Sequence, residues 1–292
     1  MREVVIVEAV RSPVGRRNGG LSTMHSVELL AAVQQELIRR SGIDPTEVGQ
    51  VVGGCVSQVG MQGFNVARTA WLTAGLPIAA AATTVDAQCG SSQQATNLAT
   101  ALVASGVVDV AVGCGVEVMS RVPMGASMGQ GVGKAVPKSY FSRYQWTSQF
   151  QGAELIAQKW GIGRDELDAF GKRSQDLAAK AWAEGRFERE VVPVEAPQRD
   201  KEGNLTGEVL TVDRDQGLRE TTLESLANLK PVMEGALHTA GTSSQISDGA
   251  AAVLWMDEDV ARARGLRPKA RITYHTMVGT DPYYGLDGPV HA

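Results

Sequence analysis

A single cysteine stands where a short β-branched run gives way to a helical pattern. The run is TTVDAQ, and Cys89 and Gly90 follow it directly. Beyond them, small and apolar residues recur at helical offsets, namely Ala95, Leu98, Ala99, Leu102 and Val103. Cys89 is therefore expected at a strand-to-helix turn, where unpaired N–H groups and about half a positive charge favour thiolate over thiol. A thiolate in this position could serve as a nucleophile.

A helix terminus does not by itself make a cysteine mostly thiolate. Ionising most of an ordinary thiol at pH 7 takes roughly 2.7 kcal/mol of differential stabilisation. A helix terminus supplies roughly 0.3 to 1 kcal/mol at exposed sites and about 2 kcal/mol in partly buried ones, so a base is still needed. Free cysteine is also among the most buried residue types. On position and spacing alone, Cys89 is either a nucleophile or a buried thiol, whereas Cys55 and Cys114, inside glycine-flanked strands, are interpreted as structural.

Short valine-rich runs alternate with helical patterns up to about residue 118. The runs are VVIVEAV, VGQVVGGCV, TTVDA and VDVAVGCGVEVM. Between the first two, SVELLAAVQQELIRRSG carries apolar residues at helical spacing, and Gly42 is the expected stop. This alternation predicts an α/β layer with a parallel or mixed sheet that is covered on its faces. Glycine-rich strands such as VGGCV indicate close backbone approach.

The alternation is suspended from Ser120 to about Gly249. The loop-like RVPMGASMGQGVGKAVPKSY is followed by a predicted helix pair from Gly152 to about Gly185 and by a charged, turn-rich stretch. The alternation resumes with a predicted strand in AAAVLWMD, a helix in DEDVARARGL and a strand in ARITYHTMVG, and a helix could begin in GLDGPVHA. Residues 120–249 are therefore interpreted as an excursion inserted into one α/β domain, and such excursions often cover a ligand site.

Composition favours a small ligand over a polymer or a membrane. The 292 residues carry 28 basic and 32 acidic side chains, a net charge of −4, which gives no electrostatic footprint for nucleic acid or an anionic membrane. No apolar segment approaches the roughly 20 residues that cross a bilayer, and the chain begins with a strand pattern rather than a signal sequence. A cytoplasmic location is therefore expected. Three widely spaced cysteines encode neither a disulfide framework nor a CxxC metal site.

Six stretches, taken together and in order, match one known family. They are VVIVEAVRSPVGRRNGGL, VDAQCGSSQQA, GCGVEVMSRVP, GAELIAQKWGIGRDELDAF, GRFEREVVPV and HTAGTSSQISDGAAAV. They resemble the thiolases, acyl-CoA acyltransferases that cleave or form β-ketoacyl-CoA, and the resemblance runs from residue 1 to the end of the chain. Two stretches look especially close to actinobacterial thiolases of steroid side-chain degradation, RDQGLRETTLESLANLKPVMEGALHTAGTSSQISDGAAAVLWMD and DPYYGLDGPV.

The resemblance implies a layered α/β/α fold and a division of the chain. Residues 1–119 and 250–268 would form the N-terminal thiolase domain, residues 120–249 an inserted CoA-binding loop domain, and residues 269–292 the start of a C-terminal domain. It implies coenzyme A and acyl-CoA as substrates, with no tightly bound cofactor and no metal. It also implies a homodimer or homotetramer of full-length chains, without a nucleic-acid or membrane partner.

The resemblance makes Cys89 the nucleophile that takes the acyl group as a thioester, with its own N–H as an oxyanion-hole donor. The stretch HTAGTSSQISDG matches the family segment that lies along the pantetheine arm of CoA. There, Ala240 and Gly241 would let a narrow ligand pass close to the backbone, and Ser244 would hydrogen-bond its amides. A solvated Ser/Thr/Gly loop is the alternative for this segment.

Other matches are looser. Arg219 lies near the family's nucleotide-contacting arginine, one residue closer to TTLE than in many members, and Ser225 matches a CoA-loop position whose alternative is a solvated helix edge. Glu117 matches a position that is better interpreted as a structural hydrogen-bonder than as a base. Around TSQFQGAEL many biosynthetic thiolases carry a His-Met pair, whereas this chain has no histidine between His25 and His238. The difference indicates a pocket for bulkier acyl chains.

The second half of thiolases supplies motifs that residues 1–292 lack: an Asn-Glu-Ala-Phe segment, a Gly-His-Pro segment whose histidine activates the nucleophile, and a glycine-flanked cysteine acting as acid and base. None of the histidines has the Gly-His-Pro context, these being His25, His238, His275 and His291. The expectation is a truncated, proteolysed or frameshifted thiolase that binds acyl-CoA weakly, turns over poorly and self-associates through an exposed face. Two alternatives stay open, a ketoacyl-synthase-like condensing enzyme and a non-catalytic CoA-binding or scaffold subunit.

Overall fold

The computed structural model describes residues 2–129, 131, 133–200 and 202–292. The chain divides into two compact units. The first comprises Met1–Ser127, Glu188–Gly217 and Ile246–Tyr274, and the second comprises Met128–Phe187, Leu218–Gln245 and His275–Ala292. Glu188–Gly217, which the sequence analysis placed in the excursion, thus groups with the first unit. The domain boundaries implied by the family resemblance remain a prediction.

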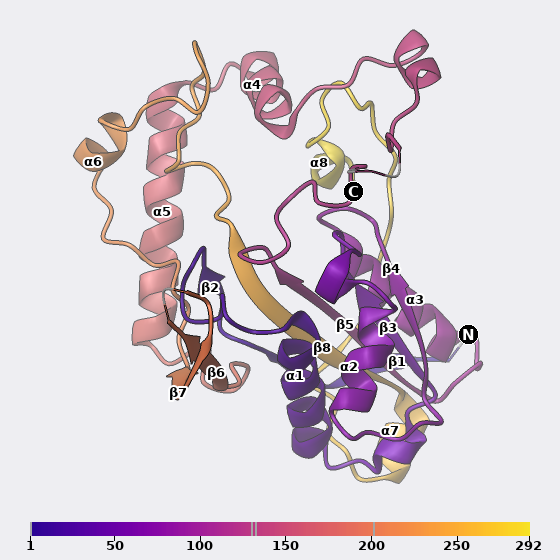
Figure 1. Ribbon diagram of the computed structural model, residues 1–292. Coiled ribbons are helices and arrows are strands. Elements are labelled where there is room, and N and C mark those ends of the chain that lie inside the picture. Colours follow the sequence, from indigo (N-terminus) through magenta and orange to yellow (C-terminus); the bar gives the residue numbers. More distant parts are fainter. Residues whose placement is uncertain (1, 130, 132, 201) are drawn as a thin grey trace. The chain divides into compact units, whose positions relative to one another are not determined.

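A seven-stranded mixed sheet forms the centre of the first unit (Figure 1). Its strands are β1 (Val4–Arg11), β2 (Gly15–Arg16), β3 (Gln50–Gly54), β4 (Ala81–Val85), β5 (Val110–Val118), β8 (Ser247–Asp257) and β9 (Ala270–Arg271). The order is β4-β3-β5-β8-β1-β9, and β2 also pairs with β8. β3 is parallel to β4 and β5, whereas β8 is antiparallel to β5 and β1. The predicted parallel or mixed sheet is confirmed.

Helices cover both faces of this sheet. They are α1 (Ser26–Ser41), α2 (Val66–Thr73) and α3 (Ser91–Ala104). α1 and α2 share a core with Val51 and Val112, whereas α3 shares a core with Val52 and Ala111. Neighbouring residues of a strand point to opposite faces, so α3 lies across the sheet from α1 and α2. The layered α/β/α arrangement predicted from the sequence is confirmed.

The first helix begins and ends where the sequence pattern predicts. His25 caps the start of α1, because its Nδ1 accepts a hydrogen bond from the Val27 N–H at 3.2 Å. Gly42 ends the helix in the left-handed conformation, with φ 71°, which glycine adopts without a steric penalty. Leu29, Leu30 and other apolar residues on the sheet-facing side are fully buried. Burial of this face fixes the helix to the sheet.

A hairpin in the first unit was not predicted from the sequence. The charged, turn-rich stretch forms β6 (Val194–Arg199), which pairs antiparallel with β7 (Leu205–Val212). Most of β7 is exposed, so its sequence lacks the apolar alternation that indicates a strand. Asp200 closes the turn by accepting a hydrogen bond from the Asn204 N–H at 2.8 Å.

The strand predicted in ARITYHTMVG is wrong beyond its first two residues. Only Ala270 and Arg271 pair with β1. The following residues carry no strand, and Tyr274 is 75% exposed. A strand persists only where a neighbouring strand supplies the ladder of hydrogen bonds, and β1 supplies it here at two positions.

The helix predicted in DEDVARARGL is confirmed as α7 (Glu258–Ala263). Two 3₁₀ segments complete the unit, η1 (Pro45–Glu47) and η2 (Gly60–Gln62).

The second unit is built on the predicted helix pair, α4 (Gln149–Trp160) and α5 (Arg164–Ala183). Ser148 and Gln151 form a capping box at the start of α4, and Gly161 ends the helix with φ 65°. The shorter elements are η3 (Lys138–Ser142), α6 (Leu223–Ala227) and α8 (Gly288–His291).

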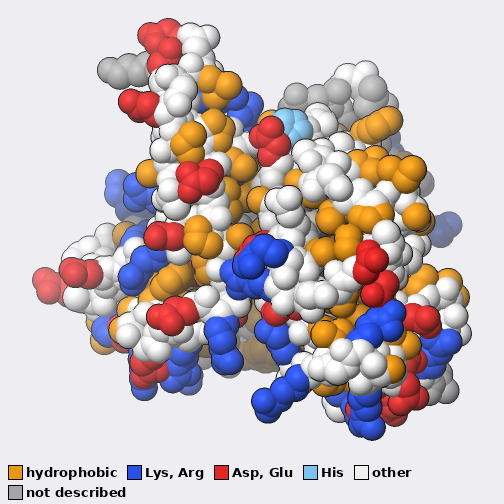
Figure 2. All heavy atoms as spheres, turned by 90° about the horizontal axis from the view of Figure 1, so that it is seen from below, with side chains coloured by type: hydrophobic (Ala, Val, Ile, Leu, Met, Phe, Trp, Pro, Cys, Tyr) orange, Lys and Arg blue, Asp and Glu red, His pale blue; other side chains and the backbone are white. Residues whose placement is uncertain are grey.

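Within the described ranges, no helix is long and apolar enough to cross a membrane. Figure 2 shows one face on which Lys and Arg side chains are interspersed with Asp and Glu. This mixture agrees with the mixed charges along the sequence.

Candidate active site

Cys89 lies in a tight turn between β4 and α3. Gln88 just before it adopts a left-handed backbone conformation with φ 52°, which is unusual for a residue with a side chain. Gly90 is the N-cap of α3, and the Gly90 N–H donates to Ala87 O at 3.1 Å. The Cys89 side chain is exposed. The turn therefore presents the thiol to solvent immediately before the start of a helix.

Hydrogen bonds hold this turn in one geometry. The Ser91 hydroxyl, 4% exposed, donates to Gln88 O at 2.6 Å and accepts from the Ala87 N–H at 2.9 Å. Asp86 Oδ1 accepts from the Gln88 N–H at 2.7 Å. The left-handed Gln88 is thus supported on both sides, as a strained residue must be if it is to persist.

Two glycines let the start of α3 approach the sheet. A Cβ added at Gly54 would overlap the backbone of Ser91 and Ser92, and a Cβ at Gly115 would overlap the Ser92 side chain. Gly54 is the last residue of β3, and it pairs in register with Gly115 of β5. The close backbone approach predicted for the glycine-rich strands is confirmed, and it places the Cys89 turn directly over the sheet.

The other cysteines are buried, as predicted. Cys55 is 1% exposed and Cys114 is 3% exposed. Burial raises the pKa of the Cys55 thiol well above its usual range and raises the pKa of Cys114 to about 12. Each sulfur lies 3.5 Å from the side-chain nitrogen of a buried glutamine, Gln62 for Cys55 and Gln34 for Cys114. Both thiols are structural.

This difference predicts selective modification. When the folded protein is treated with iodoacetamide at neutral pH, Cys89 should react, whereas Cys55 and Cys114 should stay unmodified because they are inaccessible and protonated. Peptide mass spectrometry after alkylation measures the outcome. Modification of all three thiols at similar rates would contradict the burial described above.

Glu117 serves the structure rather than the thiol. Its Oε1 accepts from the Val56 and Ser57 N–H groups, and its Oε2 accepts from Gln62 Nε2 at 2.7 Å. The carboxylate thus fixes the chain that leaves β3. This arrangement agrees with the interpretation of Glu117 as a structural hydrogen-bonder.

No base contacts the thiol within the described part of the chain, where nothing is hydrogen-bonded to Cys89 Sγ. The one histidine of the first unit, His25, has its Nδ1 engaged at the start of α1. General-base catalysis needs a base within hydrogen-bond reach. The described residues therefore offer an accessible nucleophile without an attached base.

In the second unit, the predicted CoA-binding loop folds around a buried threonine. Thr239 is 0% exposed, and its Oγ1 accepts from the Gly241 N–H at 3.1 Å while its carbonyl accepts from the Ser243 hydroxyl at 2.8 Å. Ala240 and Ser244 are exposed on this loop. Two residues predicted for CoA thus face solvent together on one ordered loop.

Close packing at residue 241 leaves no room for a side chain, so only glycine fits there. A Cβ at Gly241 would overlap Leu226 of α6 and lie 3.1 Å from Leu229 Cδ1. From the other side, a Cβ at Gly171 of α5 would lie 2.7 Å from Gly241 O. The loop is therefore packed between α5 and α6, which the sequence analysis did not anticipate.

Arg219 and Ser225 lie before and on α6. The Arg219 side chain is exposed, and its N–H donates to Gln175 Oε1 at 3.0 Å. Ser225 forms a capping box with Thr222, in which its N–H donates to Thr222 Oγ1 at 3.0 Å. Ser225 thus has a structural role that the sequence match did not reveal. The spacing TTLES, a threonine three residues before a serine at a helix start, was the available signal.

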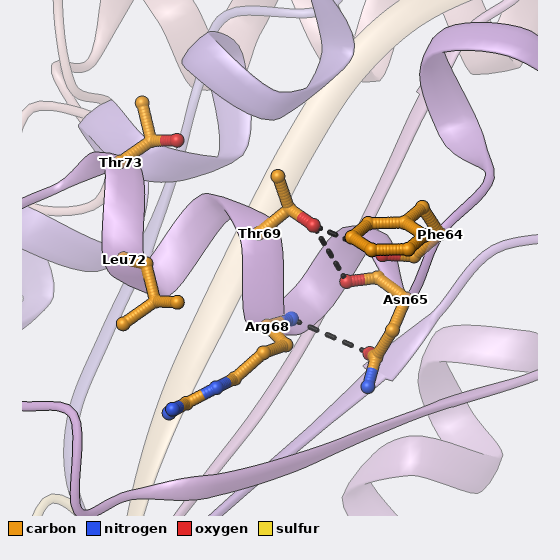
Figure 3. Close-up of a pocket in the computed structure, with 6 residues that line it drawn as sticks. All are labelled: Phe64, Asn65, Arg68, Thr69, Leu72 and Thr73. Carbon is orange, nitrogen blue, oxygen red and sulfur yellow. Dashed lines mark hydrogen bonds between the residues drawn. The ribbon is translucent and has the colours of Figure 1, made fainter.

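A separate hollow of about 670 Å³ opens on α2 and the turn before it (Figure 3). It is lined by Phe64, Asn65, Arg68, Thr69, Leu72 and Thr73. Phe64 is 96% exposed, and its carbonyl accepts from the Thr69 hydroxyl at 2.9 Å. None of the residues predicted for acyl transfer lines this hollow.

Among the residues that the structure describes, no cluster of three or more His, Cys, Asp or Glu could hold a metal ion.

Comparison with known proteins gives a consistent result. The family model described as thiolase, N-terminal domain, matches residues 4–259. Steroid 3-ketoacyl-CoA thiolase FadA6 of Mycobacterium tuberculosis is 41% identical over 300 residues, which cover 100% of this chain and 71% of that protein. A 3-ketoacyl-CoA thiolase of Idiomarina loihiensis is 40% identical over 299 residues, which cover 100% of this chain and 74% of that protein. The crystal structure of the Bacillus anthracis acetyl-CoA acetyltransferase has a TM-score of 0.84 and 34% identity, covering 97% of this chain and 73% of that one.

Proposed function

Because this chain belongs to the thiolase family, we propose that it transfers acyl groups from 3-ketoacyl-CoA to coenzyme A through a thioester on Cys89. The supporting observation is the exposed thiol, set one residue before the N-cap of α3 in a hydrogen-bonded turn. The two other cysteines are buried and protonated, which supports Cys89 as the proposed reactive sulfur.

The proposed reaction has two half-reactions. In the first, Cys89 Sγ attacks the 3-keto carbon of the substrate, a carbon–sulfur bond forms, and the bond between C2 and C3 breaks. The electron pair of that bond leaves with acetyl-CoA as a carbanion, which takes up the proton that the Cys89 thiol releases. In the second, the thiol of free CoA attacks the thioester, so that a shortened acyl-CoA leaves and the cysteine is regenerated. The Cys89 N–H is proposed to stabilise the oxyanion formed in each step.

The CoA contacts are proposed from the second unit. The exposed Ala240 and Ser244, with the backbone at Gly241, suit the narrow pantetheine arm. The exposed guanidinium of Arg219 suits the phosphates, which arginine binds with paired hydrogen bonds. Ser225 is retained as a further proposed contact beside the same loop. CoA acts as a substrate here, and no tightly bound cofactor is proposed.

The acyl group is proposed to be a bulky one of the steroid side-chain type, degraded by β-oxidation. The relative from Mycobacterium tuberculosis carries that substrate class in its name. In this chain, Trp146 lies before α4 and is 52% exposed, Phe150 lies in the first turn of α4 and is 43% exposed, and the stretch TSQFQGAEL contains no histidine. We propose that these large apolar side chains of the second unit favour a large apolar acyl group, since apolar side chains dominate the lining of ligand sites.

The contacts of Cys89 bear on the rate of the two half-reactions. Among the described residues, none is hydrogen-bonded to Cys89 Sγ, so no base is in place there to activate the thiol or to protonate the leaving group. We therefore propose acylation up to about one equivalent, with slow release, because the first step consumes the free thiol and the second needs an activated CoA.

A homo-oligomer and a cytoplasmic location are also proposed. β4 is an edge strand of the sheet, and exposed apolar side chains lie in the residues that precede it, these being Phe64 at 96%, Leu72 at 42% and Ile78 at 81%. Exposed apolar residues beside a free strand edge favour self-association. The family resemblance supports a dimer or tetramer.

A stoichiometric burst tests the proposed function. The protein is mixed with acetoacetyl-CoA in the absence of free CoA, and the release of acetyl-CoA is followed by chromatography. The expected result is a release that levels off near one equivalent per chain, because each cysteine accepts one acetyl group. A CoA-binding scaffold, the alternative from another class, would bind the substrate and release nothing, and it would also show Cys89 alkylation no faster than a model thiol.

A further inference from the structure

One buried carboxylate in the second unit collects the hydrogen bonds that lead into the CoA loop. Glu154 of α4 is 9% exposed. Its two oxygens each lie 3.0 Å from the Leu237 nitrogen, and Oε1 accepts from the His238 N–H at 2.9 Å. The same Oε1 lies 2.6 Å from His238 Nδ1. The carboxylate therefore holds both the backbone and the side chain of the residue that precedes Thr239.

The protonation of this pair follows from its contacts. Burial alone would raise the pKa of Glu154, but hydrogen bonds from the Leu237 and His238 N–H groups and from the His238 ring hold it below its usual value. An ionised carboxylate can only accept hydrogen bonds, so His238 Nδ1 must carry the hydrogen of the 2.6 Å contact. A charge-assisted bond of this kind is stronger than a neutral one.

The position of the pair connects it to the ligand loop. His238 O accepts from the Val232 N–H at 3.0 Å, and the next residue, Thr239, organises the turn that carries Ala240 and Gly241. The loop is packed against α5 and α6 at Gly241, whereas the two residues just before it, Leu237 and His238, are bonded to α4 through the Glu154 carboxylate.

We infer that Glu154 and His238 form a clamp that positions the loop of residues 239–244 for the pantetheine arm, with His238 as a positioning residue. This inference rests on the proposed function, because that loop is the proposed CoA site. A loop held in its binding geometry binds more tightly, since less ordering is needed when the ligand arrives. The clamp does not touch the reacting atoms, so it should change the CoA concentration needed rather than the rate of bond formation.

Two variants of His238 separate the clamp from a general structural role. His238→Ala removes the ring but keeps both backbone hydrogen bonds to Glu154. His238→Asn keeps a side-chain N–H donor at the same distance from the backbone as Nδ1, so it should restore the contact with the carboxylate. Circular dichroism checks that each full chain remains folded.

The first measurement is amide hydrogen exchange of residues 239–244 in the free protein. His238→Ala should speed exchange at least about fivefold, whereas His238→Asn should stay near the wild-type rate. The second is acylation by acetoacetyl-CoA at increasing concentration, together with titration by CoA itself. His238→Ala should raise the half-saturating concentration and the CoA dissociation constant about tenfold, leave the maximal acylation rate within about twofold, and be rescued by His238→Asn.

The outcomes distinguish this inference from the proposed function. Wild-type protein that neither binds CoA nor becomes acylated would overturn both. Wild-type protein that binds CoA, with His238→Ala binding as tightly and exchanging as slowly, would overturn the clamp alone. A fall in maximal acylation rate at unchanged half-saturation would also overturn it, because positioning of the CoA arm would then not be the role of His238.

Discussion

Gly54→Ala is expected to displace the start of α3 and to destabilise the protein by about 3 kcal/mol or more, since overpacking of a rigid core typically costs about 1–3 kcal/mol. The added Cβ would overlap the backbone of Ser91 and Ser92, which cannot rotate away as a flexible side chain could. Because Ser91 holds the turn at Gln88, the displacement should also reach Cys89.

Urea unfolding and the rate of Cys89 alkylation measure these two effects. Gly279→Ala is the matched control, because a Cβ there would meet nothing within 4 Å, the residue is exposed, and its φ lies outside the left-handed region. The control should unfold within about 0.5 kcal/mol of the wild type, as expected for a surface substitution. A Gly54→Ala protein with wild-type stability and wild-type alkylation would show that α3 does not need this close approach.

Cys89→Ser is expected to abolish acyl transfer, with the acetyl-CoA burst falling at least about a thousandfold in rate. The hydroxyl is a much weaker nucleophile than a thiol at neutral pH and needs an attached base, which the described contacts of residue 89 do not provide. The fold should be unaffected, because the Cys89 side chain is exposed and of similar size to serine.

Cys114→Ala is the comparison for this variant. It removes a buried thiol of the same chemical type, so it should lower stability by a kcal/mol or so while the burst persists. The burst is measured as acetyl-CoA released in the first minutes after mixing. Equal bursts from Cys89→Ser and the wild type would assign the acyl group to another residue.

The elements that position Cys89 were predictable from the sequence because local patterns and tertiary packing agree there. The run TTVDAQ and the small-residue helix after it each carry a clear period, and the two meet at Cys89 and Gly90. The glycine pattern of VGGCV indicated close approach, which Gly54 confirms. What the sequence could not give is the left-handed Gln88, since glutamine has no preference for that conformation.

The sequence-based predictions were wrong or incomplete where the structure depends on contacts between residues that are far apart in the sequence. The β6–β7 hairpin is largely exposed, so no apolar alternation marks it. The strand in ARITYHTMVG is short because β1 pairs with it only briefly. Glu154 and His238 are 84 positions apart in the sequence, and neither residue has a local pattern that distinguishes it from an ordinary surface residue. The two side chains meet because the fold brings α4 and the loop together within the second unit, and no local sequence pattern predicts that contact.

The most direct test of acyl transfer to Cys89 is intact-mass spectrometry of the purified protein before and after a short incubation with acetoacetyl-CoA, followed by peptide mapping. We expect one acetyl increment, located on Cys89 and removed by hydroxylamine, which cleaves thioesters. An unmodified protein, or an increment on any other residue, would contradict the claim that the turn between β4 and α3 carries a live thiolase nucleophile.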